Sequence, residues 1–431
     1  MSSEAKAMTQ KKNCKPKLRF PEFRSAAAWR NRQLNELLFE AKQRNRTLEL
    51  GLNDVLSVSG EYGCVNQIAF MGRSYAGVSV KDYHVVESGD IVYTKSPLKR
   101  SPYGIIKENK GKRGIVSTLY AVYRPFPDCS ATYLDHFFSG DYNLNAYLQP
   151  IVKKGAKNDM KVNNADVLKG DICVPALKEE QQKIADCLSS ADELIFTLTR
   201  KMDTIKTHKN GLMQQLFPRE GENQPRLRLP EFRGGEKWRS DSLGKLFDTS
   251  SGGTPERSKA EYWYGNVPWI TTSLVGFNII TKADEFISDV GLNSSSAKIF
   301  PEKTVLVAMY GQGKTRGQVA MLGIRAATNQ ACCAILPRTG IDPHFVFLNL
   351  GSRYEEMRRL SNSGGQENLS QGLIQGLQFS YPNNIDEQIA ITNCLSSLDD
   401  LIDAQVQELE AVKTHKKGLM QQLFPLPEID L

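Results

Sequence analysis

The sequence contains no run of apolar residues that approaches the roughly 18 needed to cross a bilayer. Its first 17 residues are polar and lysine-bearing, which does not look like a secretion signal. The eight cysteines are scattered, form no C-x-x-C pair and have no histidine at metal-ligand spacing. These absences argue against a membrane protein and a zinc module, and we expect reduced, buried thiols in a soluble, cytoplasmic protein.

Catalytic motifs are missing as well. No Asp-Pro-Pro-Tyr or Asn-Pro-Pro-Phe element is present, so methyl transfer to an amino group has no visible motif, and nothing resembles a nuclease core. None of the five histidines pairs with a suitable serine or cysteine nucleophile. We therefore expect this chain not to be an enzyme.

Positive charge is in modest excess, and much of it lies at one end. The net charge is +7, but residues 1–20 hold six lysines and arginines against Glu4. A flexible basic tail therefore accounts for most of the excess. Bulk charge is only a hint of nucleic-acid binding, and local patches must support that interpretation.

A long internal repeat organises the chain. Residues 180–218 return almost unchanged at 387–425, an offset of 207, and both copies end in Gly-Leu-Met-Gln-Gln-Leu-Phe-Pro. A second repeat opens each unit, because Leu-Arg-Phe-Pro-Glu-Phe-Arg at 18–24 matches Leu-Arg-Leu-Pro-Glu-Phe-Arg at 227–233. The 431 residues, 40% of them hydrophobic, therefore predict two tandem units with real cores.

The repeated segments predict helices with a heptad pattern of apolar residues, interrupted by Lys209, Gln405 and Lys416. Roughly 36 helical residues would extend about 54 Å, too long to pack inside one small domain. Two unrelated amphipathic helices, each buried on its own domain, would show the same heptads. The duplication favours the alternative, in which the two helices pair antiparallel about a pseudo-two-fold axis. The seam residues are Ile184, Leu188, Ile195, Leu198, Ile205, Ile391, Leu395, Leu398, Ile402 and Leu409.

Between the repeats lie two divergent regions of mixed helices and short strands, so we predict an α+β fold with two mixed α/β domains joined by two long antiparallel coiled-coil helices. Predicted strands include 90–94, 114–123, 304–308 and 331–336. The expected segments are a flexible tail (1–17), a first domain (18–177), a helix (178–217), a linker (218–226), a second domain (227–384), a second helix (385–425) and a tail (426–431).

Basic and amide-rich loops recur at matching places in both divergent regions. Residues 95–113 hold seven lysines and arginines against Glu108 alone, and Lys314 and Arg316 occupy the corresponding loop of the second region. A Gly/Lys/Asn-rich loop follows in each, at 153–158 and 361–368. Any one of these could be an ordinary solvated loop. Their recurrence favours DNA contact, since amide and guanidinium groups can read base edges and lysines bind phosphate.

One segment imitates a nucleotide-binding loop. Residues 308–315, Ala-Met-Tyr-Gly-Gln-Gly-Lys-Thr, follow an apolar strand and satisfy a relaxed phosphate-loop pattern. The next residues put Gly317 in the first turn of the required helix and look more like a turn into another strand. A basic loop that approaches DNA phosphate explains the same residues.

Taken together, these motifs resemble the DNA-specificity subunit of type I restriction-modification enzymes. The resemblance rests on the two repeats and on three elements of the second region, and it covers nearly the whole chain. These elements are Ser-Gly-Gly-Thr-Pro at 251–255, Tyr262-Trp263 with Val-Pro-Trp-Ile at 267–270, and Ala-Thr-Asn-Gln-Ala at 327–331. The first region lacks the Ser-Gly-Gly-Thr-Pro element, so its site residues rest on loop position and charge.

The resemblance implies that each divergent region is a target-recognition domain that reads one half of a split double-stranded DNA target. The paired helices would fix the spacer and dock two modification (methyltransferase) subunits, while restriction subunits translocate and cut DNA. S-adenosylmethionine, ATP and Mg would bind to these partners and not to this chain. The alternatives are a nucleotide-binding enzyme that uses the Lys314 loop, and a coiled-coil scaffold with protein-binding inserts.

The expected DNA-contacting residues are basic, amide, hydroxyl or aromatic side chains of the loops described above. They are Lys95, Lys99, Arg100, Lys112, Arg113, Lys154, Lys157, Thr254, Arg257, Tyr310, Gln312, Lys314, Arg316, Asn329, Gln330, Gln366 and Asn368.

Overall fold

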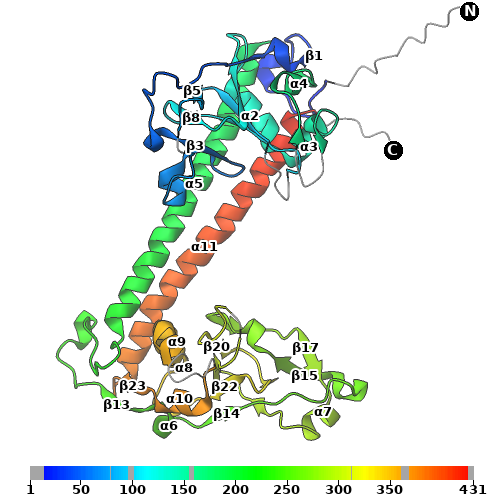
Figure 1. The fold of residues 1–431 in the computed structure, drawn as a ribbon. Coiled ribbons are helices and arrows are strands. Elements are labelled where there is room, and N and C mark those ends of the chain that lie inside the picture. Colours follow the sequence, from blue (N-terminus) through cyan, green and yellow to red (C-terminus); the bar gives the residue numbers. More distant parts are fainter. Residues whose placement is uncertain are drawn as a thin grey trace, which may run out of the picture. The chain divides into compact units, whose positions relative to one another are not determined.

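The structure, a computed structural model, describes residues 14–77, 79–95, 101–154, 160–311, 313–360 and 368–425. The described residues up to Leu198 and from Glu408 onward form one compact unit, and Thr199–Gln407 form a second. Both units mix helices and strands (Figure 1), so the predicted α+β class is confirmed. None of the helices in these ranges is long and apolar enough to cross a membrane.

The first unit contains a four-stranded antiparallel sheet in the order β2–β9–β6–β7, accompanied by the strand pairs β1–β12, β3–β4, β5–β8 and β10–β11. Residues 114–123 do not form the single strand we predicted, because the Tyr120 amide donates to the Ser117 carbonyl at 3.0 Å and a turn separates β8 from β9. The strands are β1 (Arg30–Gln33), β2 (Leu38–Glu40), β3 (Leu56–Ser59), β4 (Gly63–Asn66), β5 (His84–Val86), β6 (Ile91–Thr94), β7 (Ile105–Glu108), β8 (Gly114–Val116), β9 (Tyr120–Pro125), β10 (Lys153–Lys154), β11 (Met160–Lys161) and β12 (Asp171–Val174).

The second unit has two larger sheets, in the orders β14–β22–β19–β20–β16 and β17–β15–β21–β18, and the separate pair β13–β23. The pairs β16–β20 and β15–β21 are parallel and the others are antiparallel. The strands are β13 (Arg239–Ser242), β14 (Thr249–Ser251), β15 (Trp263–Ile270), β16 (Asn278–Ile280), β17 (Glu285–Ile287), β18 (Ile299–Phe300), β19 (Val305–Ala308), β20 (Val319–Leu322), β21 (Ala326–Thr328), β22 (Cys332–Ile335) and β23 (Gln378–Tyr381).

The two units share a topology that their divergent sequences conceal. The sheet β2–β9–β6–β7 has the same strand order as β14–β22–β19–β20 when the strands are numbered along each unit. In each unit the first and last strands also form a separate pair, β1–β12 and β13–β23. The short helices are α1 (Gln67–Met71), α2 (Ala131–Ser139), α3 (Asp141–Leu148) and α4 (Asn164–Val167) in the first unit, and α6 (Leu243–Leu246), α7 (Asp289–Asn293), α8 (Pro343–Ser352), α9 (Tyr354–Leu360) and α10 (Gln371–Gly376) in the second. Helices α2 and α3 follow β9 as α8 and α9 follow β22, and α4 precedes β12 as α10 precedes β23, whereas α1, α6 and α7 have no α-helical counterpart among the described residues of the other unit.

Two helices of 39 residues each, α5 (Lys178–Leu216) and α11 (Ile385–Leu423), contribute to both units. In the first unit, Leu188 near the start of α5 shares a core with Leu423 at the end of α11. The second unit reverses the roles, because Leu216 at the end of α5 shares a core with Leu395 near the start of α11. All four leucines are fully buried, and each contributes about 1.5–3 kcal/mol of apolar burial.

A buried glutamate at the start of each long helix explains the repeated opening motif. Glu180 accepts hydrogen bonds from the Arg19 guanidinium and, at 2.9 Å, from Trp29 Nε1. The equivalent glutamate, Glu387, accepts from Arg228 and Trp238 in the same way. The motif therefore ties the first residues of each unit to the helix that ends it.

One cysteine expectation was wrong. Cys14 and Cys173 form a disulfide bond although 159 residues separate them. Sequence spacing gave no sign of this pair, because β12 brings Cys173 next to the opening segment only in the folded chain. The other six cysteines are free thiols, and burial raises the pKa values of Cys332 and Cys333 to about 12.

Candidate nucleic-acid interface

The end of β19 is the point where the predicted loops of the second unit converge. The Met309 amide donates to the Ala331 carbonyl at 2.8 Å, and the Met309 carbonyl accepts from the Leu369 amide at 3.0 Å. These two bonds place Tyr310 beside the segments that carry Asn329, Gln330 and Asn368. Residues from three distant loops are thereby brought together, and Tyr310 and Asn368 are both exposed.

The Ser-Gly-Gly-Thr-Pro element lies against the same segment. The Gly253 amide donates to the Thr328 carbonyl at 2.9 Å, and the Thr254 hydroxyl donates to Gln330 Oε1 at 2.6 Å. A Cβ at Gly252 would lie 1.9 Å from the Thr328 carbonyl oxygen, so only glycine allows this approach. The geometry orients the exposed Thr254 and Gln330 side chains together, while Asn329 Oδ1 accepts from the Ala331 amide at 3.2 Å.

The Arg257 guanidinium packs against two tryptophan rings. Its guanidinium carbon lies 3.8 Å from the ring centroid of Trp263 and 5.0 Å from that of Trp269, and it forms an ion pair with Glu285. The indole of Trp263 donates to the Glu256 carbonyl and that of Trp269 to the Gly253 carbonyl. Cation–π contact and these two bonds fix Arg257 while more than half of its side chain stays exposed.

Helix α9 braces the loop that carries Lys314. The Tyr354 hydroxyl donates to the Lys314 carbonyl at 2.7 Å, and Arg358 donates to the Gly313 carbonyl at 2.7 Å. Gly313 has φ +66° and Gly317 has φ +84°, values that favour glycine, so the loop can turn sharply at both points. Because both carbonyls are engaged by α9, the exposed Lys314 side chain is set on a fixed backbone.

The nucleotide-binding alternative finds no support in this loop. A phosphate-binding loop must continue into a helix whose first amides bind phosphate. Here the chain passes through Gly317, whose amide donates to the Ala308 carbonyl, and continues as the strand β20. Arg316 is half-buried at the base of the loop.

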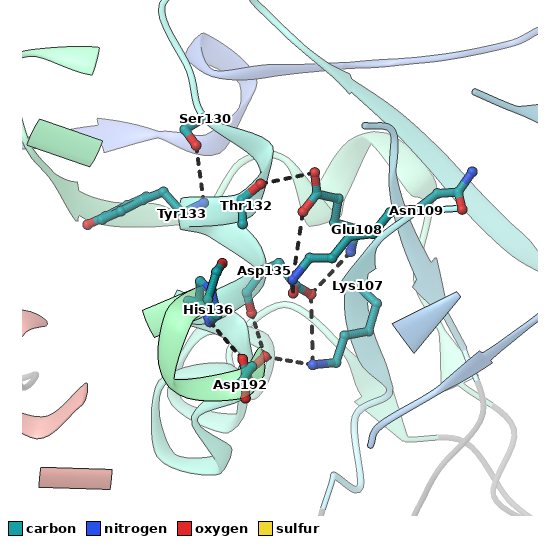
Figure 2. Close-up of polar contacts among 12 residues, drawn as sticks. Lys107, Glu108, Asn109, Ser130, Thr132, Tyr133, Asp135, His136 and Asp192 are labelled. Carbon is teal, nitrogen blue, oxygen red and sulfur yellow. Dashed lines mark hydrogen bonds and ion pairs between the residues drawn. The ribbon is translucent and has the colours of Figure 1, made fainter. Parts of the chain in front are cut away.

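Of the seven cations at 95–113 in the first unit, Lys107 is buried and Lys110 is exposed but paired with a carboxylate, which corrects the expectation of a loop of free surface cations. Lys107 is buried in β7, where it donates to the Ser139 hydroxyl at 2.6 Å and lies 3.8 Å from Asp135 (Figure 2). Lys110 forms an ion pair with Asp135 at 2.9 Å. Burial alone would raise the pKa of Asp135, but the two lysines lower it below its ordinary value.

The same cluster joins α2 to the long helices of the first unit. His136 of α2 lies next to Asp192 in Figure 2, with 3.8 Å between Nδ1 and Oδ2, and its Nε2 lies 3.0 Å from the Ser189 hydroxyl. Lys416 of α11 forms an ion pair with Asp192 of α5. Burial lowers the pKa of His136 to about 4, so the imidazole is neutral at neutral pH.

The remaining predicted cations of the first unit have mixed surroundings. Lys112 is exposed, and Arg113 is engaged by Glu87 at 2.9 Å and Glu49 at 3.5 Å. Lys95 is half-buried directly after β6, the strand that corresponds to β19. Some predicted residues lie outside the described part of the chain: Lys99, Arg100, Lys157, Gln312, Gln366 and the side chain of Lys154.

The predicted seam residues all face away from solvent to some degree. Ile184, Leu188, Leu198, Ile391, Leu395 and Leu409 are buried, whereas Ile195, Ile205, Leu398 and Ile402 are half-buried. Two of the three polar breaks, Lys209 and Lys416, form ion pairs with aspartates of the other long helix. Lys209 of α5 pairs with Asp399 of α11 at 2.5 Å in the second unit, and Lys416 and Asp192 repeat this pair in the first.

Sequence reasoning missed the residues that position the interface. Tyr354 and Arg358 act through backbone carbonyls of a loop 40 and 45 residues away, which leaves no local pattern. For Trp263 and Trp269 a signal was available, because both fall in motifs that we had already singled out. Their spacing did not show that they would support Arg257.

Comparison with known proteins gives one family. Residues 235–414 match the family described as "Type I restriction modification DNA specificity domain". The chain is 26% identical over 258 residues to the specificity subunit of the type I restriction enzyme EcoR124I/EcoR124II of Escherichia coli, a match that covers 58% of this chain and 60% of that protein. It is 24% identical over 192 residues to the MjaIX specificity subunit of Methanocaldococcus jannaschii, covering 43% of this chain and 44% of the relative. The chain thus spans less than two thirds of the length of either relative.

Two solved structures share the fold over most of the chain. The S subunit of a type I restriction-modification system from M. genitalium superposes with a TM-score of 0.57 at 13% identity, covering 96% of this chain and 99% of that one. A second solved chain comes from a study of the "complex assembly" and "conformational transition of the type I R-M system". It superposes with a TM-score of 0.56 at 17% identity, covering 92% of this chain and 97% of that one. At these identities the likeness concerns the fold alone.

Proposed function

We propose that this chain, which belongs to the family of type I restriction-modification specificity subunits, recognises double-stranded DNA on behalf of a methyltransferase and endonuclease complex. Each of its two recognition domains, residues 18–177 and 227–384, reads one half of a bipartite target. The chain itself is not catalytic. Methyl transfer, translocation and cleavage, with S-adenosylmethionine, ATP and Mg, belong to modification and restriction subunits in the cytoplasm.

The observation that carries this proposal is the convergence of side chains at the end of β19. Thr254 and Gln330 form an exposed hydrogen-bonded pair next to Tyr310, while Arg257 and Lys314 are each held on a rigid support. Amide and guanidinium groups on fixed backbones can read base edges, and an exposed lysine can bind a phosphate. We assign the other predicted contacts of both domains to the same role, with Lys107 and Lys110 assigned to structure.

The long helices, residues 178–217 and 385–425, act in this proposal as an antiparallel spacer that fixes the gap between half-sites. Two observations support the pairing: the reciprocal ion pairs Lys209–Asp399 and Lys416–Asp192, and the exchanged core contacts of the helix ends. Each ion pair lies inside its own unit. A stiff coiled coil would hold the recognition domains at a constant spacing along the DNA.

The helices also offer equivalent surfaces for two modification subunits. Leu194 of α5 is 44% exposed and Leu401 of α11 is 53% exposed. These leucines occupy matching positions of the 207-residue repeat. Exposed leucines on a charged helix favour a protein partner, and their duplication favours two copies of it.

Mapping methylated bases tests the proposal. The full chain is produced with its methyltransferase subunits, and modified positions in DNA are sequenced. A bipartite target with a constant gap is expected. One heptad inserted in both helices at facing positions, after Thr204 and after Asp403, adds about 10 Å and should lengthen the gap by about three base pairs. An unchanged gap with full activity would show that the helices do not set the spacing between half-sites. Methylation without any sequence preference would contradict the proposal.

A further inference from the structure

Tyr264 has an unusual combination of exposure and backbone conformation. Its side chain is 94% exposed, more than any other large apolar or aromatic side chain in the described ranges. Its φ is +60°, in the left-handed region that bulky residues rarely adopt. Glycine adopts this conformation without strain, whereas tyrosine in it destabilises the folded state. Because the ring is almost fully exposed, its packing does not offset that strain.

The strand β15 forces this conformation on residue 264. Trp263 and Val267 both lie opposite Ile287 of β17, so the three residues between them form a bulge. A Cβ at Gly265 would lie 2.3 Å from Ser288 Cα, so the backbone at that position fits tightly against the end of β17. The Ser288 amide donates to the Tyr262 carbonyl at 2.9 Å and fastens the other side of the bulge. Tyr264 is therefore a rigid projection from the sheet.

The projection borders the surface described above. The residue before it, Trp263, lies under the Arg257 guanidinium and bonds to the loop that contains Thr254. Strained conformations persist where the surrounding structure enforces them and cluster at functional sites, and bulges often redirect a side chain next to a binding site. An aromatic ring presented beside an arginine and a hydroxyl–amide pair suits a nucleotide, because a base offers a flat face on which the ring can stack.

We propose that Tyr264 contacts the DNA directly, with its ring stacked on or wedged against a base step of the second half-site. The inference rests on the proposed function and adds to it a specificity residue that no loop pattern indicates. The bulge sets the ring in place before DNA arrives, so little side-chain freedom is lost on binding.

Three substitutions separate this role from a structural one. Tyr264→Ala keeps the backbone conformation and removes the ring, and stacking contacts of this kind make affinity fall by about tenfold or more when lost. Tyr264→Phe keeps the ring and should bind within about twofold of the parent. Tyr264→Gly also loses the ring but relieves the backbone, so its Tm should rise by about 2 °C while its affinity falls. Stability and binding moving in opposite directions is a result that a purely structural role would not give.

The experiment uses the full chain assembled with its modification subunits, on duplex DNA containing the target mapped for the parent complex. Duplexes with 2-aminopurine in the second half-site should change their fluorescence on binding by the parent and by Tyr264→Phe, because the ring alters base stacking, but not on binding by Tyr264→Ala. Val290→Ala, an exposed apolar residue of α7 in the same unit, is the control and should behave as the parent. If the parent binds and Tyr264→Ala binds equally well, or loses modification subunits instead of DNA, this inference is wrong. A parent complex with no preferred sequence would instead overturn the proposed function.

Discussion

Arg19 and Glu180 form a two-bonded ion pair, with both guanidinium–carboxylate distances at 2.7 Å, across 161 residues of the chain. Arg228 and Glu387 form the same pair at 2.6 Å in the second unit. Both carboxylates are almost fully buried and also accept a tryptophan N–H. The repeated opening motif thus supplies the arginine of this contact, and the repeated long helix supplies its glutamate.

Removing this carboxylate should destabilise the first unit. Glu180→Gln leaves Arg19 without its charge partner, and breaking such a buried pair costs about 3–5 kcal/mol of the free energy of unfolding. Chemical denaturation of the full chain, followed by tryptophan fluorescence, measures the change. Glu22→Gln is the matched control, because Glu22 pairs with Lys183 at the surface and its loss should have no measurable effect. Equal stability of Glu180→Gln and the parent would show that the pair does not hold the unit together.

Docking of modification subunits should depend on the exposed leucines of the helices. Leu194→Lys is expected to give complexes with one modification subunit, and the double variant with Leu401→Lys complexes with none, since a lysine cannot be buried at the contact without loss. Mass photometry of the co-produced complexes counts the subunits. Thr207→Lys, at an exposed polar position of α5, should keep both. Two bound subunits in the double variant would place docking elsewhere.

Acid should weaken the first unit through His136. Burial lowers its pKa to about 4 in the folded chain, against an ordinary value near 6.5, and the facing groups are Lys110 and Lys416, which lower it further, and Asp135 and Asp192, which oppose them. The folded state thus prefers the neutral imidazole, so this contribution is complete above pH 6.5 and is lost as the pH falls toward 4. By pH 5 the loss should reach about 2 kcal/mol.

Denaturation of the parent and of His136→Gln at pH 7.5 and pH 5.0 tests this dependence. The difference in unfolding free energy between the two pH values should be about 2 kcal/mol smaller in the variant. His208→Gln, an exposed substitution on α5, should leave the pH dependence of the parent unchanged. The same pH dependence in parent and His136→Gln would exclude His136 as the titrating group.

The Lys314 loop should act on DNA together with Tyr354. Lys314→Ala is expected to weaken DNA binding by the assembled complex and to reduce the log–log salt slope by about 0.9, the share of one phosphate contact. Tyr354→Phe removes the bond to the Lys314 carbonyl and the bond that the hydroxyl accepts from Arg358, which itself holds the Gly313 carbonyl, so it should act through the lysine loop. In a double-mutant cycle, Tyr354→Phe should therefore cost less once Lys314 is alanine. If the losses of binding free energy in the two single variants were additive, Tyr354 would not act through Lys314. If Lys314→Ala had the same salt slope as the parent, the loop would not contact DNA.

Much of the framework could be predicted from the sequence because it is repeated. The heptads of 180–218 and 387–425 predicted long helices, and Lys209 and Lys416 could be identified as polar breaks. Their partners, Asp399 and Asp192, could not, since each lies on the other helix at a register that no single helix specifies. The candidate site divides in the same way. Gly252 and Thr254 belong to a recognisable motif, whereas Tyr354 and Arg358 contact the Lys314 loop only through the fold.

Long-range pairing also explains the errors. Lys107 looked like part of an exposed basic loop because Asp135, which draws it inward, lies 28 residues further along the chain. The disulfide of Cys14 with Cys173 depends on β12 lying beside the opening segment. The positive φ of Tyr264 comes from a bulge of β15 opposite Ile287. The residues around Tyr264 in the sequence did not indicate this bulge.

The central claim, that two separable domains read two halves of one DNA target, is tested most directly by exchanging one domain. Residues 227–384 are replaced with the corresponding domain of another specificity subunit, the chain is produced with its own modification subunits, and methylated positions are mapped across a genome. The expected result is a target in which one half-site changes while the other half-site and the gap stay as in the parent. A change in both half-sites, or in neither, would contradict the account.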